Sequence, residues 1–193
     1  MGLELTKDHF YQWDGVTFPG VTNTLLSAGL IDTSRFDEYY RERGSMAHRA
    51  IALSLEGDLD RESLDPAIAG FVTAAERAVE ALGIIPLEIE KCLFSKIFKY
   101  GGTLDLYGIR RNTDTMIVVD WKTGNVEPWV ALQLAAYSQL AFEDSPNLKF
   151  EERISVRLNS DGKFKVHSFT NPTDRDVFLA ALAVTNWKNN NNR

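Results

Sequence analysis

A short apolar segment that ends in charged residues places the strongest constraint on this chain. Residues 116–124 read MIVVDWKTG, with an apolar run directly before Asp120, Trp121 and Lys122. Such a run predicts a buried strand. Burying a carboxylate or an ammonium without a partner is costly, so Asp120 and Lys122 must be paired, solvated or bound to a ligand. The segment therefore predicts a buried strand with an acidic and a basic side chain at its end.

The composition is that of an ordinary globular protein. The chain has 193 residues, of which 44% are hydrophobic and 25% are charged, and this length fits one domain, residues 1–193. The net charge of -6 argues against a general nucleic-acid coat, although local patches can still bind phosphate. A lone cysteine, Cys92, permits no internal disulfide, so we expect a reducing, cytoplasmic compartment.

The pattern of apolar and turn residues predicts a mixed α/β fold, with a helical part at about residues 20–83 and a core at about residues 84–170. A hairpin turning at Asp14-Gly15 and a brief helix after Pro19-Gly20 are expected first. The predicted helices are residues 34–55, with a candidate break at Gly44, then 65–82, 129–142 and 173–187. The predicted strands are residues 86–98, 103–109, 115–121, 152–158 and 163–169. Residues 188–193 are predicted to be a disordered tail.

The hairpin before the charged segment brings a second carboxylate into play. A turn at Asn112-Thr113 would place Asp105 opposite Asp120 on neighbouring strands, with Cβ atoms roughly 5 Å apart. Two carboxylates at that distance repel each other unless one takes up a proton or a cation lies between them. Together with the backbone carbonyl of Trp121, they would form an oxygen shell that suits Mg²⁺.

Lys122 would lie beside this site. It could orient or deprotonate a metal-bound water, or stabilise charge on a phosphoryl oxygen. The alternative is a solvated strand end at which Asp120 and Lys122 form an ordinary surface salt bridge.

Three further polar residues fit a catalytic site. Gln133 and Tyr137 share one face of the helix that follows the charged strand. His48 follows Gly44 by one helical turn, and a neutral imidazole is a good metal ligand. The alternatives are that Tyr137 packs in the core, that Gln133 is solvated and that His48 is structural.

These pieces together resemble a known family. The matching motifs, in chain order, are Gly44-x-x-x-His48, Gly102-Thr103-Leu104-Asp105, Asp120-Trp121-Lys122-Thr123-Gly124 and Gln133-x-x-x-Tyr137. In this order and spacing they resemble the PD-(D/E)XK nuclease superfamily, specifically its RecB-like exonuclease branch of phage and CRISPR-associated enzymes. The resemblance implies a restriction-endonuclease-like core, a central mixed sheet flanked by helices, in a cytoplasmic protein of phage or bacterial origin.

The resemblance also implies a metal site. It assigns Asp105, Asp120 and the Trp121 carbonyl to a Mg²⁺ or Mn²⁺ ion, with His48 as an additional ligand. Asp120 stands where many relatives carry glutamate, and the shorter side chain still binds metal.

Further roles follow from the same resemblance. Lys122 is implied to be the catalytic lysine, and Gln133 and Tyr137 are implied to position the DNA strand. An acidic residue on the preceding strand often completes such sites. Glu88 and Glu90 are both candidates, and we prefer Glu90.

Arginines near the His48 helix are candidates for DNA contacts. Arg41, Arg43 and Arg49, together with Arg35, could bind phosphates. Alternatively, these arginines lie on solvated helix faces, balanced by neighbouring carboxylates.

The aromatic residues Phe36, Tyr39 and Tyr40 lie in the first part of this predicted helix. They could stack on unpaired bases, but we expect them to pack in the core.

The function that these features predict is a metal-dependent DNA exonuclease acting on duplex or single-stranded ends in repair, recombination or phage DNA processing. The alternatives are an endonuclease of the same fold or an inactive DNA-binding module. A homo-oligomer or a recombination partner protein is a further expectation, because the chain contains no motor motif.

Overall fold

The computed structural model describes residues 4–6, 10–32, 37–113, 115–148 and 150–191, so Arg35 and Phe36 lie outside the described residues. The elements in chain order are β1 (Glu4–Leu5), β2 (Tyr11–Trp13), β3 (Val16–Phe18), α1 (Val21–Ser27), α2 (Glu38–Glu56), α3 (Pro66–Ala81), β4 (Ile84–Ser95), β5 (Tyr100–Arg110), β6 (Met116–Lys122), α4 (Val130–Asp144), β7 (Phe150–Leu158), β8 (Phe164–Ser168) and α5 (Asp174–Asn191).

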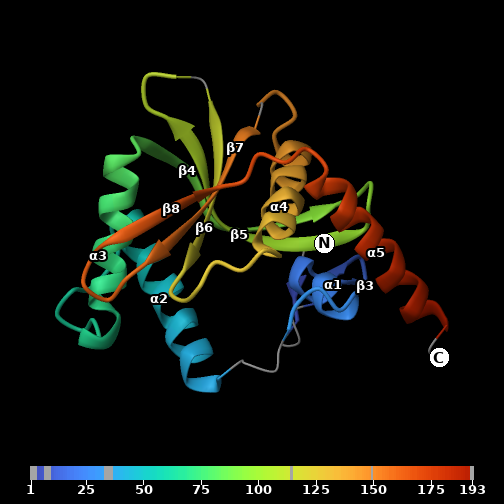
Figure 1. Ribbon diagram of the computed structural model, residues 1–193, viewed down its shortest axis with the longest axis horizontal. Coiled ribbons are helices and arrows are strands. Elements are labelled where there is room, and N and C mark those ends of the chain that lie inside the picture. The colour runs from blue at the N-terminus through green and yellow to red at the C-terminus, as the bar shows by residue number, and fades with distance from the viewer. Residues whose placement is uncertain (1–3, 7–9, 33–36, 114, 149, 192–193) are drawn as a thin grey trace.

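A five-stranded mixed sheet in the order β4-β5-β6-β7-β8 forms the centre of the molecule, with helices on both faces (Figure 1). Strands β6 and β7 are parallel, and all other neighbours in this sheet are antiparallel. Helix α4 connects β6 to β7 and provides the crossover that a parallel pair requires. The prediction of an α/β fold with a central mixed sheet flanked by helices is confirmed.

Each face of the sheet has its own hydrophobic core, and β6 contributes to both. Met116 and Val118 pack in the core under α4 and α5, whereas Ile117, Val119 and Trp121 pack in the core under α2 and α3. This alternation follows from the pleat of a strand. Burial of each apolar side chain stabilises the fold by about 1.5–3 kcal/mol. Continued to the end of β6, the alternation directs Asp120 and Lys122 to the α4 side.

The pairing of β5 with β6 has the register that the turn at Asn112-Thr113 predicts. Leu106 pairs with Val119 and Ile109 pairs with Met116. The same register, extended by one position, sets Asp105 opposite Asp120 on the neighbouring strand.

Helix α2 is continuous through Gly44, so the predicted break there is wrong. A Cβ at Gly44 would lie 3.4 Å from Thr123 Oγ1, at the limit of ordinary van der Waals contact. Helix α2 therefore passes next to the residue that follows β6. The side chain of Asp37 caps the start of α2 by accepting a hydrogen bond from the Tyr39 N–H.

Helix α3 has the predicted signals at both ends. Asp65 accepts a hydrogen bond from the Ala67 N–H, Pro66 is the first helical residue, and Gly83 adopts a φ of 60° just beyond the end.

The two ends of the chain add smaller features. The β2–β3 hairpin turns at Asp14-Gly15 as predicted, and β1 adds an unpredicted third strand to form a small antiparallel sheet. Helix α5 continues to Asn191, so the predicted disordered tail is helical as far as the structure describes it. Among the described residues, no helix is both long enough and apolar enough to cross a membrane.

Candidate active site

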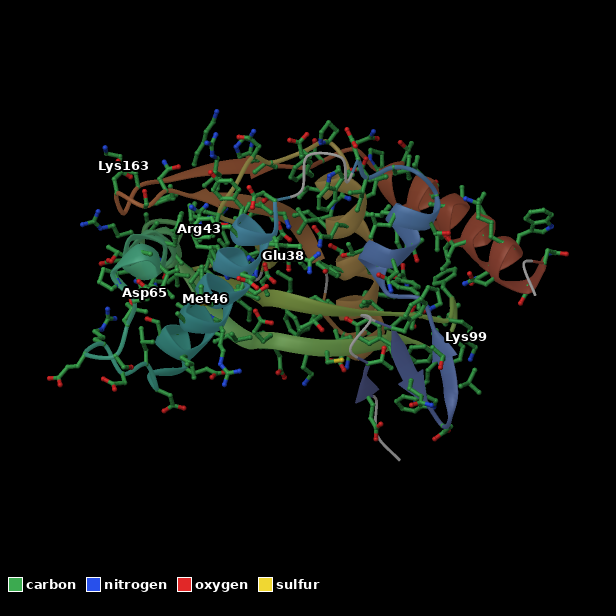
Figure 2. The ribbon with its side chains drawn as sticks, turned by 90° about the horizontal axis from the view of Figure 1, so that it is seen from below. Glu38, Arg43, Met46, Asp65, Lys99 and Lys163 are labelled. Atoms are coloured by element: carbon green, nitrogen blue, oxygen red, sulfur yellow. The ribbon has the colours of Figure 1, made fainter. Side chains whose placement is uncertain are left out.

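A large cleft lies where α1 and α2 meet the edge of the main sheet and helix α4. Its volume is about 1170 Å³, and its lining includes His48, Glu90, Lys122, Gln133 and Tyr137. Figure 2 looks onto this side of the molecule, where the labels Glu38 and Arg43 mark the N-terminal part of α2. The sequence motifs therefore meet in one cavity, although they come from four different elements.

Three potential metal ligands converge at this cleft, and two of them, His48 and Glu90, line it. His48 of α2, Glu90 of β4 and Asp105 of β5 each offer a ligand atom, and these atoms all lie within 4.8 Å of one another. His48 Nδ1 is 3.3 Å from Asp105 Oδ1. Of the two acidic candidates on β4, the structure brings Glu90 into the group. Glu88 instead forms an ion pair with Lys91 at 3.1 Å.

An irregularity in the β4–β5 pair places Glu90 and Asp105 in this group. Leu104 packs under α4, yet Leu106 packs in the core under α2 and α3, so the alternation of β5 fails at Asp105. On β4, Glu90 has a φ of 46°, in the left-handed region that non-glycine residues rarely adopt. Such strain commonly occurs at functional sites, where the surrounding packing maintains it.

The three groups strongly perturb each other's protonation. Burial alone would lower the pKa of His48, but the charge of Asp105 and its hydrogen bond outweigh burial and raise that pKa to about 9. Burial would raise the pKa of Asp105, but His48 and the Trp121 N–H lower it instead. Burial of the carboxyl group and the Asp105 charge raise the pKa of Glu90 to about 7. The cluster of these three residues therefore favours a positive charge among them, either a proton or a cation.

Asp120 and Lys122 form a buried ion pair next to this group. Lys122 Nζ donates to Asp120 Oδ1 at 2.7 Å, and Ser155 Oγ donates to Asp120 Oδ2 at 3.1 Å. Asp120 is only 1% exposed, so the alternative of a solvated surface salt bridge is wrong. Burial raises the pKa of Asp120 above its usual range, although Lys122 acts in the opposite direction.

Helix α4 also contacts the Lys122 ammonium. Lys122 Nζ donates to Gln133 Oε1 at 3.1 Å, and Gln133 Nε2 donates to the Tyr137 hydroxyl at 3.0 Å. The Lys122 ammonium also lies 5.4 Å from the centre of the Trp129 ring. Both Gln133 and Tyr137 are buried, and Tyr137 is part of the core under α4 and α5, so the alternative of a solvated Gln133 is wrong. Their observed contacts position the lysine.

The backbone of β6 is tied to the same site. The Trp121 N–H donates to Asp105 Oδ2 at 2.7 Å, while the indole is buried under α2 and α3. Asp105 therefore joins the two strands as well as contacting His48.

The predicted DNA-binding arginines have different positions. Arg41 and Arg49 are exposed and line the cleft. Arg43 instead lies with its guanidinium 5.0 Å from the Tyr40 ring centre and 5.1 Å from the Phe71 ring centre. Tyr39 and Tyr40 are exposed, so the prediction that they pack in the core is wrong.

Sequence reasoning missed several residues of the site. Ser155, which contacts Asp120, is a lone hydroxyl between the apolar residues Ile154 and Val156 of β7, and that pattern could have marked it. Tyr11 also lines the cleft, and its hydroxyl is 3.0 Å from Thr103 Oγ1. Nothing near Tyr11 in the sequence relates it to the motifs, because the contact spans a large sequence separation.

Comparison with known proteins gives only distant structural similarity. No family model matches the sequence, and no curated protein does so either. A candidate exonuclease from Eubacterium rectale superposes over 86% of this chain and 74% of its own, with a TM-score of 0.45 and 8% identity. An alkaline exonuclease from Laribacter hongkongensis superposes over 85% of this chain and 90% of its own, with a TM-score of 0.35 and 16% identity. At these TM-scores neither comparison carries a function to this chain, and we infer the function below from the site itself.

Proposed function

We propose that this protein is a metal-dependent nuclease that hydrolyses phosphodiester bonds at DNA ends. The observation that carries this proposal is the convergence of His48, Glu90 and Asp105 beside the partly buried Lys122. A cluster of hard ligands next to a fixed cation is suited to the hydrolysis of a charged phosphodiester. An exonuclease of this kind would serve DNA repair, recombination or phage DNA processing.

The donor set fits a divalent cation such as Mg²⁺ or Mn²⁺. Carboxylate oxygens suit both ions, and the imidazole of His48 adds a nitrogen ligand. We keep Asp120 and the Trp121 carbonyl in the proposed ligand set, because both lie across the strand pair from Asp105. When bound, the ion would neutralise phosphate charge and lower the pKa of a coordinated water.

The residues around Lys122 would hold its ammonium in place for the reaction. Asp120 and Gln133 accept hydrogen bonds from Nζ, and Tyr137 in turn holds Gln133. Because Lys122 lines the cleft, its ammonium could donate to a phosphoryl oxygen there. Pre-positioned donors of this kind need little reorganisation during the reaction.

The cleft supports DNA as the substrate despite the overall charge of -6. Arg41 and Arg49 line the same cavity as the proposed metal ligands, so they could contact the phosphates on either side of the cleaved bond.

A cleavage assay tests this proposal. End-labelled linear duplex, linear single strands and closed circular DNA would each be incubated with Mg²⁺ or with chelator, using the wild type and the Lys122→Ala variant. We expect metal-dependent loss of linear DNA, intact circles and a rate at least about 100-fold lower for the variant. The Lys163→Ala variant, which removes an exposed lysine from the β7–β8 turn, is the matched control and should cleave normally.

Two results would change the proposal. Cleavage of closed circles would indicate an endonuclease. Equal activity of wild type and Lys122→Ala would contradict the assignment of the site.

A further inference from the structure

One side of helix α2 forms a continuous wall of the cleft. Tyr40, Gly44 and His48 follow one another at intervals of one helical turn, and Arg41, Ser45 and Arg49 run beside them. Tyr40 is therefore about 12 Å along the helix axis from His48. That length corresponds to about three stacked nucleotides, measured along one strand of DNA. A DNA end whose terminal phosphodiester reaches the proposed metal ligands would pass Tyr40.

Tyr40 contributes little to the hydrophobic core. It is 57% exposed, although it is a large aromatic side chain in a well-formed helix. Tyr40 is among the residues that line the cleft, together with charged residues such as Arg41 and Glu90. An aromatic ring in such a position offers a π-face to a ligand.

The Tyr40 ring is nevertheless held in place. The Arg43 guanidinium lies 5.0 Å from the ring centre and is itself packed over Phe71 of α3. Tyr39 contacts the same ring in an edge-to-face arrangement, with 5.5 Å between centroids. These contacts restrict the ring before any ligand binds, which lowers the entropic cost of binding.

Two exposed arginines along this wall can contact a nucleic-acid strand, and one of them, Arg41, also forms an exposed ion pair with Glu38 at 3.1 Å. Arg41 and Arg49 are exposed on the cleft, next to Tyr40 and His48 respectively. Phosphates can contact these arginines whether the DNA is paired or unpaired. The aromatic ring adds discrimination, because an unpaired base can leave its neighbours and stack on a side chain, whereas the bases within a duplex are already stacked on each other.

We propose that Tyr40 is a stacking site for an unpaired nucleobase, and that the preferred substrate is a single-stranded DNA end. This inference rests on the proposed nuclease function, for which it specifies the substrate class. Arg41 and Arg49 hold the phosphates of the strand while Tyr40 holds a base a few nucleotides from the cleaved bond.

A binding experiment with a matched pair of variants tests the inference. Trp187→Ala is the control for Tyr40→Ala, because Trp187 is also an exposed aromatic residue, at 65%, and is not among the described residues that line the cleft. Binding of a fluorescein-labelled single strand and of a blunt duplex would be measured by anisotropy in chelator, where the proposed nuclease is inactive. Thermal melting would confirm that each variant is folded.

We expect the wild type to bind the single strand more tightly than the blunt duplex. Tyr40→Ala should weaken single-strand binding by about 10-fold and leave duplex binding nearly unchanged. Tyr40→Phe, which keeps the ring, and Trp187→Ala should both bind like the wild type. Equal losses for Tyr40→Ala and Trp187→Ala, or tighter binding of the blunt duplex by the wild type, would overturn the inference.

The cleavage assay separates this inference from the nuclease proposal. Metal-dependent cleavage without any effect of Tyr40→Ala on single-strand binding would refute the stacking site and leave the nuclease proposal standing. Single-strand binding that depends on Tyr40 but comes with no cleavage would support the stacking site and contradict the nuclease proposal.

Discussion

The inner and outer ends of the cleft hold their polar side chains in opposite ways. At the inner end, Asp120, Lys122 and Gln133 are linked by hydrogen bonds and largely buried. At the outer end, Tyr40 and Arg41 are exposed on the first turn of α2. The inner residues are positioned by the same contacts that stabilise the fold. The outer residues can be exchanged with little effect on the fold, so changes there should alter binding alone.

The largest expected effect concerns a proposed ligand at the inner end. Asp105→Asn should reduce the cleavage rate by about 100-fold or more, because a neutral amide is a weaker metal ligand than a carboxylate. The amide oxygen can still accept the hydrogen bond from the Trp121 N–H, so the fold should persist. Initial rates on end-labelled linear DNA measure the loss of cleavage, and thermal melting measured in parallel shows whether the variant is folded. A folded variant with a rate within twofold of the wild type would contradict the metal-site assignment.

A second prediction tests whether the inner end depends on close packing. A Cβ at Gly102 would lie 2.8 Å from both Tyr137 Cε1 and Leu140 Cδ1. Gly102→Ala should therefore lower the free energy of unfolding by about 1–3 kcal/mol and displace Tyr137 from Gln133.

Gly124→Ala is the matched control for this change, since a Cβ there would meet no atom within 4 Å. Denaturant unfolding of the two variants gives the comparison directly. Similar stabilities for both would show that the inner end is packed more loosely than the structure indicates.

The smallest effect is expected for an exposed arginine on the wall of the cleft. Arg49→Ala should weaken DNA binding a few-fold. The dependence of the logarithm of the binding constant on the logarithm of the salt concentration should become less steep, by about the amount that one phosphate contact contributes. The free energy of unfolding should change by no more than about 0.5 kcal/mol. Salt titrations of binding for Arg49→Ala and the control Lys163→Ala test this. An unchanged salt slope for Arg49→Ala would place the DNA elsewhere.

The sequence predicted the inner end better than the outer end, and the reason is local geometry. The turn at Asn112-Thr113 determines the register of β5 and β6, so the positions of Asp105 and Asp120 follow from residue counting. The apolar run before Asp120 likewise identified the buried strand that carries it.

The choice between Glu88 and Glu90 could not be made from spacing. Strand alternation places both on one face, but the φ of 46° at Glu90 breaks the alternation there. A single left-handed residue in a long strand has no sequence signal unless it is glycine or asparagine.

Tyr39 and Tyr40 were misassigned for a different reason. Their apolar rings suggested a core position, because periodicity does not reveal which part of a helix is covered by its neighbours. In the structure, the buried residues of α2 begin only at Ala47, so the aromatic residues of its first turn remain in solvent. Tertiary packing decided their exposure.

Metal binding tests the central claim most directly, because the account depends on His48, Glu90 and Asp105 forming one cation site. Calorimetric titration with Mn²⁺ would compare the wild type with Glu90→Gln and with the control Glu88→Gln. We expect the wild type and Glu88→Gln to bind Mn²⁺ alike, and Glu90→Gln to bind at least about 10-fold more weakly. Wild-type protein that binds no Mn²⁺, or equal affinities for all three proteins, would contradict the account.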